Sequence, residues 1–161
     1  MAVASATTQT LVALAFLAAL IGGLWAVVAL VGRGRRRRDE QLWRQWHEVR
    51  DHARIAPGSG AGALGQIRNY RQRARRGLKA YVFWPATGEV GAAWFWHRWP
   101  PVGAYVVARG SWGAGEHHSE NVFYIHEDEL VAIVDGDAPA AWERHERRRQ
   151  QEAPAARVPL S

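Results

Sequence analysis

The hydrophobic and polar positions divide the chain into one long apolar segment and a mixed remainder. Residues 11–32 read LVALAFLAALIGGLWAVVALVG and contain no charged side chain. A helix of this length extends over about 33 Å, which is enough to cross a hydrocarbon core of about 30 Å. The pattern therefore predicts a transmembrane helix over residues 11–32, preceded by a short extracytoplasmic segment, residues 1–10. A cleaved signal peptide is disfavoured because no basic residue precedes the apolar run.

Basic residues flank only the C-terminal end of this segment. They are Arg33, Arg35, Arg36, Arg37 and Arg38. Because positive charge stays on the cytoplasmic side, the N-terminus is expected outside and the rest of the chain in the cytoplasm. The sequence thus predicts a single-pass protein of the cell membrane. The five arginines are interpreted as a topology signal, with contact to anionic lipid of the inner leaflet as a second interpretation.

Residues 39–54 predict an amphipathic helix, and with the arginines they form a juxtamembrane segment, residues 33–54. Leu42, Trp46 and Val49 recur at helical spacing, with Trp43 beside them. Three interpretations remain open: the tryptophans lie among lipid headgroups, the helix packs on the distal domain, or it packs on a second copy of itself. Trp43 and Trp46 are accordingly candidate lipid contacts.

The rest of the chain predicts a small α+β domain. Residues 55–65 are a glycine-rich linker, and residues 66–76 predict a basic helix with Ile67, Tyr70 and Ala74 on one side. Short β-like runs then predict five strands, over residues 78–84, 89–97, 103–109, 121–126 and 129–135. Asp137 caps a final helix, and residues 153–161 are expected to be a disordered tail. The domain, residues 66–152, is expected to be an antiparallel five-stranded sheet or barrel with flanking helices.

Charge is distributed unevenly although the net charge is only +6. Residues 33–79 hold 14 basic and 4 acidic side chains, whereas residues 80–161 hold 7 basic and 11 acidic ones. The candidate basic binding patch is Arg68, Arg71, Arg73, Arg75, Arg76 and Lys79. Such a patch could bind anionic lipid, bind nucleic acid with Tyr70 stacking on a base, or simply form a solvated helix face.

Little in the sequence indicates catalysis. The absence of cysteine excludes disulfides, thiolate metal sites and cysteine nucleophiles. His117, His118 and Glu120 are weak candidates for a metal site, because their residue types suit a metal but their spacing matches no known motif. Ser111 and Ser119 lack the G-x-S-x-G setting of a nucleophile. No catalytic residue and no cofactor is therefore predicted.

The sequence favours an interaction module as the function. We expect a membrane-tethered cytoplasmic adaptor, held near the anionic inner leaflet by its basic residues and contacting another protein through its aromatic-rich sheet. One alternative is a membrane-anchored nucleic-acid-binding protein that uses residues 68–79 together with aromatic residues of the sheet. It requires the basic segment to lie on the sheet, since the distal part is acidic. A second alternative is a metal-dependent enzyme centred on residues 116–120.

Overall fold

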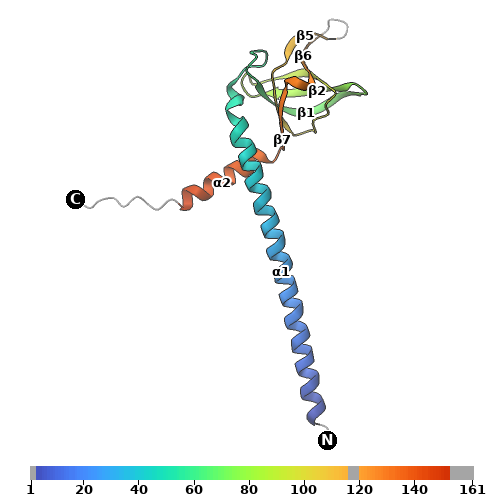
Figure 1. Ribbon diagram of the computed structural model, residues 1–161, viewed down its shortest axis with the longest axis vertical. Coiled ribbons are helices and arrows are strands. Elements are labelled where there is room, and N and C mark those ends of the chain that lie inside the picture. Colours follow the sequence, from blue (N-terminus) through green and yellow to red (C-terminus); the bar gives the residue numbers. More distant parts are fainter. Residues whose placement is uncertain (1–2, 116–119, 153–161) are drawn as a thin grey trace, which may run out of the picture. The chain divides into compact units, whose positions relative to one another are not determined.

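A computed structural model describes residues 3–115 and 120–152, without the side chains of residues 3–22 and 26–28. The chain divides into two compact units, Met1–Arg38 and Asp39–Ser161. The first unit consists of the greater part of helix α1 (Val3–Val49), whose last residues belong to the second unit (Figure 1).

The predicted membrane span is corrected by the structure. Over the part of the chain that the structure describes, which leaves out most side chains of residues 11–28, no helix is both long and apolar enough to span a membrane. The apolar run is one part of a 47-residue helix that continues without a break through Arg33–Arg38 to Val49. The predicted transmembrane helix, and with it the single-pass localisation with its outside and cytoplasmic ends, is therefore wrong.

The second unit is built on a seven-stranded sheet. Its strands are β1 (Ala63–Ala74), β2 (Gly77–Trp84), β3 (Glu89–Trp96), β4 (Tyr105–Ala108), β5 (Ser111–Ala114), β6 (Asn121–Ile125) and β7 (Leu130–Val134). Besides the end of α1, the helices of this unit among the described residues are η1 (Arg50–Arg54), η3 (Glu127–Glu129) and α2 (Ala138–Glu152). The strand order is β5-β6-β3-β2-β1-β4-β7, and all neighbours are antiparallel except β3 and β6, which are parallel. The predicted five-stranded antiparallel sheet is thus wrong, because β1 and β5 add two strands and the sheet is mixed.

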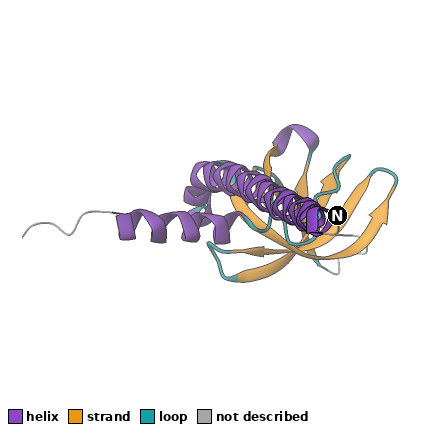
Figure 2. Cartoon of the chain, turned by 90° about the horizontal axis from the view of Figure 1, so that it is seen from below, coloured by secondary structure: helices purple, strands orange, loops and turns teal. Residues whose placement is uncertain are grey.

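The sheet curls because the chain connects its two sides. Only Arg109 and Gly110 separate β4 from β5, although these strands lie at opposite sides of the strand order. The two sides must therefore meet, as in a partly closed barrel, and Figure 2 shows the curvature of the strands. At the junction, a Cβ atom on Gly110 would lie 2.1 Å from the carbonyl oxygen of Tyr124, so only glycine allows this approach.

Two β-bulges explain why β1 resembles a helix in the sequence. The pairing of β1 with β2 shifts register between Ile67 and Asn69 and again between Tyr70 and Gln72. The β1 residues paired with the inward-facing Val82, Ala80 and Leu78 of β2 are Ile67, Tyr70 and Arg73. Directly opposed residues share a face of the sheet, so residues of one face are three apart here rather than two. This spacing resembles the period of a helix, and the predicted helix over residues 66–76 is wrong for that reason.

Two apolar clusters hold the second unit together. The barrel interior includes Ile67, Leu78, Trp84, Phe95 and Phe123, all at most 1% exposed. The other cluster lies where the end of α1 and the start of α2 cover the sheet, and it comprises Leu42, Val49, Leu64, Val107, Val134, Ala138 and Ala141. Of the three interpretations of residues 39–54, the structure shows packing on the distal domain.

Candidate functional site

The outward face of β2, β3 and β6 is rich in aromatic side chains. Leu78, Ala80 and Val82 of β2 face the barrel interior, so the alternating positions of that strand face outward. The same alternation applies to the paired strands β3 and β6. We call the outward-facing rings of these strands the aromatic face, and its members are Tyr81, Phe83, Trp94, Trp96 and Tyr124. All five are half-buried, so each ring keeps some surface for a ligand.

Strand β1 adds cations to the aromatic face. The guanidinium carbon of Arg68 lies 4.9 Å from the ring centre of Phe83, and that of Arg71 lies 5.9 Å from the ring centre of Tyr81. Both distances fall in the range of cation–π attraction. Residues of the predicted basic patch therefore lie beside aromatic rings on one sheet surface.

The hairpin between β1 and β2 carries the remaining arginines of the predicted patch. Arg73 lies near the end of β1, and Arg75 and Arg76 form the turn. All three side chains are exposed, and none forms an ion pair with another residue that the structure describes. Arg75 and Arg76 therefore offer positive charge at the tip of the hairpin, whereas Arg73 lies opposite the inward-facing Leu78 and so belongs to the other face of the sheet.

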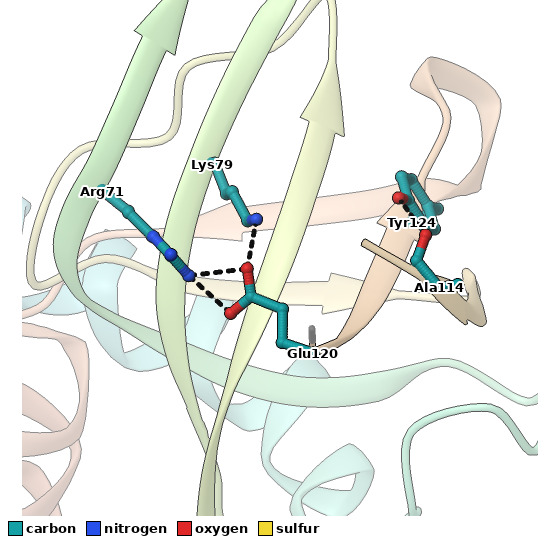
Figure 3. Close-up of polar contacts among 5 residues, drawn as sticks. All are labelled: Arg71, Lys79, Ala114, Glu120 and Tyr124. Atoms are coloured by element: carbon teal, nitrogen blue, oxygen red, sulfur yellow. Dashed lines mark hydrogen bonds and ion pairs between the residues drawn. The ribbon is translucent and has the colours of Figure 1, made fainter. Parts of the chain in front are cut away.

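Glu120 joins two of the patch cations. Its carboxylate accepts hydrogen bonds from Nη1 of Arg71 at 2.6 and 2.5 Å and from Nζ of Lys79 at 2.5 Å (Figure 3). Lys79 is only 8% exposed, and it is the one charged residue that is buried in the described part of the chain. A buried ammonium group requires a partner of opposite charge, and Glu120 supplies it.

The protonation of this trio follows from the same contacts. The hydrogen bond from Lys79, together with that from Arg71, holds the pKa of Glu120 below its ordinary value. The hydrogen bond to Glu120, and the attraction of its charge, raise the pKa of Arg71. Both shifts favour the charged forms of Arg71 and Glu120, so these two groups form an ion pair at neutral pH.

A hollow of about 170 Å³ lies beside the trio. Its lining residues are Gln72, Lys79, Trp94, Trp96, Val122 and Tyr124. The rings of Trp94 and Trp96 meet edge to face with centres 5.4 Å apart, and Trp96 stacks on His126 at 6.0 Å. The hydroxyl of Tyr124 donates to the carbonyl oxygen of Ala114 at 2.9 Å, as Figure 3 also shows. Aromatic walls with one amide and one ammonium group suit a flat ring that carries a negative group.

The sequence candidates for a metal site were His117, His118 and Glu120. His117 and His118 fall outside the described residues, and the carboxylate of Glu120 is taken up by Arg71 and Lys79. Among the described residues, no group of three or more His, Asp or Glu side chains could hold a metal ion. A metal site at residues 116–120 thus has a single described member, and that member is ion-paired.

The candidate lipid contacts are placed as follows. The side chains of Arg33, Arg35, Arg36, Arg37 and Arg38 are exposed on α1. Trp43 is half-buried and stacks on His145, with ring centres 4.6 Å apart. Trp46 meets Tyr105 edge to face at 4.8 Å. Both tryptophans therefore take part in packing within the second unit, and lipid contact by any of these residues stays a prediction.

Sequence reasoning did not find the ion-pair trio or the grouping of the rings. Glu120 is 49 residues from Arg71 and 41 from Lys79, so no local pattern connects them. Aromatic residues at alternate positions of residues 78–84 and 89–97 are visible in the sequence. Which side of each strand faces outward is determined by how the sheet closes into a barrel.

Comparison with known proteins gives no precedent for this arrangement. No protein-family model matches the chain, and it matches neither a curated protein nor a solved structure. Function is therefore inferred from the chemistry of the aromatic face and its cations.

Proposed function

We propose that the second unit is a binding module for single-stranded nucleic acid, which lies across the aromatic face and the basic strand β1. The observation that carries this proposal is the placement of Arg68 and Arg71 over the rings of Phe83 and Tyr81. Single strands present flat bases and phosphates in alternation, and proteins bind them with aromatic platforms and positive grooves. Stacking on an aromatic residue contributes about 1–3 kcal/mol per base.

The acidic excess of residues 80–161 no longer argues against this proposal. Because β1 is a strand of the sheet, Arg68, Arg71 and Lys79 share one surface with the aromatic rings. Two acidic residues outside this surface have local partners: Glu127 pairs with Arg98 at 2.8 Å, and Glu143 with Arg147 at 3.7 Å. The module thus presents positive charge where its rings are accessible.

The test is a binding titration of the full chain with a fluorescent single-stranded oligonucleotide at several salt concentrations. We expect the logarithm of the affinity to fall linearly with the logarithm of salt, by about 0.7 for each phosphate contacted. Replacing Trp94 and Trp96 by alanine should weaken binding by about tenfold or more, consistent with the loss of about 1–3 kcal/mol per stacked base. Trp99→Ala is the matched control, because Trp99 is 41% exposed and outside the aromatic face.

Two outcomes would reject this function. One is the absence of binding at low salt. The other is an equal affinity of Trp94→Ala, Trp96→Ala and Trp99→Ala for the oligonucleotide. The rings of Trp94 and Trp96 would then take no part in binding. A preference for duplex over single strands would also contradict stacking as the mode of recognition.

A protein partner is a second candidate, favoured by a different surface. Strand β7 lies at the edge of the sheet and, among the described strands, pairs only with β4. Ile133 of β7 is 44% exposed and Val102 is 52% exposed, and both line an open hollow of about 650 Å³. A free strand edge with apolar side chains suits an extended peptide that adds a strand.

This second candidate is tested with a random-peptide library. Selected peptides should carry apolar residues at alternate positions, and Ile133→Lys should abolish their binding. Glu127→Lys, at an exposed position outside the β7 strand, is the control. Selected peptides that bind Ile133→Lys as well as the wild type would exclude this edge as the site.

A further inference from the structure

We infer that Arg71, Lys79 and the adjoining hollow form a seat for one nucleotide unit, in which a phosphate replaces the carboxylate of Glu120 and the base enters the hollow. This inference rests on the proposed function and assigns residues to one step of it. In the unliganded protein, Glu120 occupies the seat as an internal anion.

The geometry of the two cations supports an anion seat. Arg71 and Lys79 come from neighbouring strands, yet their donors converge on one carboxylate at 2.5–2.6 Å. Arg71 reaches this position because it is the extra residue of the bulge between Tyr70 and Gln72. Carboxylate and phosphate oxygens are acceptors of the same kind for such charged donors. The protein therefore already holds two donors in the arrangement that a phosphate needs.

Because Lys79 is buried, a phosphate can bind to it only by replacing the carboxylate of Glu120. The Lys79 side chain is 10% exposed, so the ammonium group is costly to leave without an anion. Glu120 is more accessible, with its side chain 25% exposed. Its main chain is held by a hydrogen bond from the amide of Gly115 to its carbonyl oxygen at 2.8 Å. Release of the carboxylate thus requires only rotation of the Glu120 side chain, while β6 stays in place.

The hollow lies next to the anion seat because Lys79 belongs to both. Trp94 stands directly opposite Lys79 on β3, and Gln72 stands opposite it on β1. The Gln72 amide carries both donors and acceptors, which suits the edge of a base. A base on the Trp94 and Trp96 rings would therefore meet polar groups as well as aromatic surface.

The experiment compares Glu120→Gln with wild type in oligonucleotide binding. Glutamine keeps the shape of the side chain but gives up the charge that competes with phosphate, so affinity should rise about tenfold. Glu127→Gln is the matched control: it removes a carboxylate that is paired with Arg98 at 2.8 Å and is not among the residues that line the hollow, and it should leave affinity unchanged. Arg71→Gln should weaken binding more than Arg75→Gln, because Arg75 is an exposed turn residue outside the trio.

A second measurement tests the seat independently of longer strands. Glu120→Gln should bind adenosine 5′-monophosphate more tightly than adenosine, and wild type should bind the monophosphate more weakly than the variant. If Glu120→Gln fails to fold, as judged by circular dichroism, Glu120→Asp replaces it. The aspartate side chain is one methylene shorter than that of glutamate, so its carboxylate competes less well with phosphate. We expect a smaller rise in affinity than for Glu120→Gln.

The outcomes separate this inference from the proposed function. Suppose that wild type binds single strands and Glu120→Gln binds them no better than Glu127→Gln. The inference that phosphate replaces Glu120 is then wrong, and the proposed binding function stands. If wild type binds no single strand, the proposed function fails. Monophosphate binding by Glu120→Gln would then still support the seat, and its absence would remove both.

Discussion

The ammonium group of Lys79 and the carboxylate of Glu120 form a hydrogen-bonded ion pair at 2.5 Å across 41 residues of the chain. The pair joins the middle of the sheet to the start of β6, and Arg71 completes it from β1. Because Lys79 is buried, its partner affects both the stability of the sheet and the charge of the aromatic face.

Lys79→Met should destabilise the protein, because it leaves the half-buried Glu120 with one cation instead of two. We expect the free energy of unfolding in urea to fall by about 1–3 kcal/mol. Arg75→Met, at an exposed position of the β1–β2 turn, should change it by less than about 0.5 kcal/mol. Equal effects of the two substitutions would show that the ion pair has no special role in stability.

The contribution of Glu120 to stability should depend on pH. Its pKa is lowered in the folded protein, chiefly by the hydrogen bond from Lys79, relative to an ordinary value of 4.5. A group whose folded pKa is lowered stabilises the protein above its unfolded pKa, and the stabilisation is lost as pH falls through the folded pKa. The difference in melting temperature between wild type and Glu120→Gln should therefore be constant near neutral pH and shrink below about pH 4.5. A difference that stays constant through the acid range would contradict the ionised trio.

Gly110→Ala tests the closure of the barrel. The new Cβ atom would lie 2.1 Å from the carbonyl oxygen of Tyr124, so β4 and β5 could not keep their path. We expect destabilisation of at least about 1–3 kcal/mol in urea unfolding, typical of overpacking at a tight site. Gly34→Ala is the control, since no atom beyond the adjoining residues and backbone of its own helix lies within 4 Å of its Cβ position, and alanine favours a helix. If Gly110→Ala were as stable as wild type, the sheet would not close at this position.

Leu42→Ala tests whether the end of α1 belongs to the second unit. Leu42 is 6% exposed in the apolar cluster with Leu64 and Val107, so its truncation should cost about 2–5 kcal/mol. Leu30→Ala is the control, because Leu30 is 63% exposed on the same helix. Urea unfolding of the full chain, followed by tryptophan fluorescence, measures both. Similar small losses for both variants would mean that α1 does not pack on the sheet.

Local sequence patterns predicted several elements of the second unit. Strands β2, β3, β6 and β7 show short apolar or alternating runs bounded by turn residues, and α2 begins after Asp137. These features depend on neighbouring residues, so they can be read from the sequence alone. The sequence also determined that the basic side chains of residues 68–79 lie together, because they are close along the chain.

Only the tertiary structure decided how those basic residues are used. Because of its two bulges, residues of β1 on one face of the sheet are three positions apart, so its local pattern resembles a helix. Pairing with β2 and β4 nevertheless makes it a strand. Closure of the barrel then determined which side chains of β2 and β3 face outward. The contact of Glu120 with Arg71 and Lys79 depends on the parallel pairing of β3 with β6, which brings distant segments together. Long-range pairing of this kind leaves no periodic signal in the sequence, because its energy comes from contacts between residues far apart in the chain.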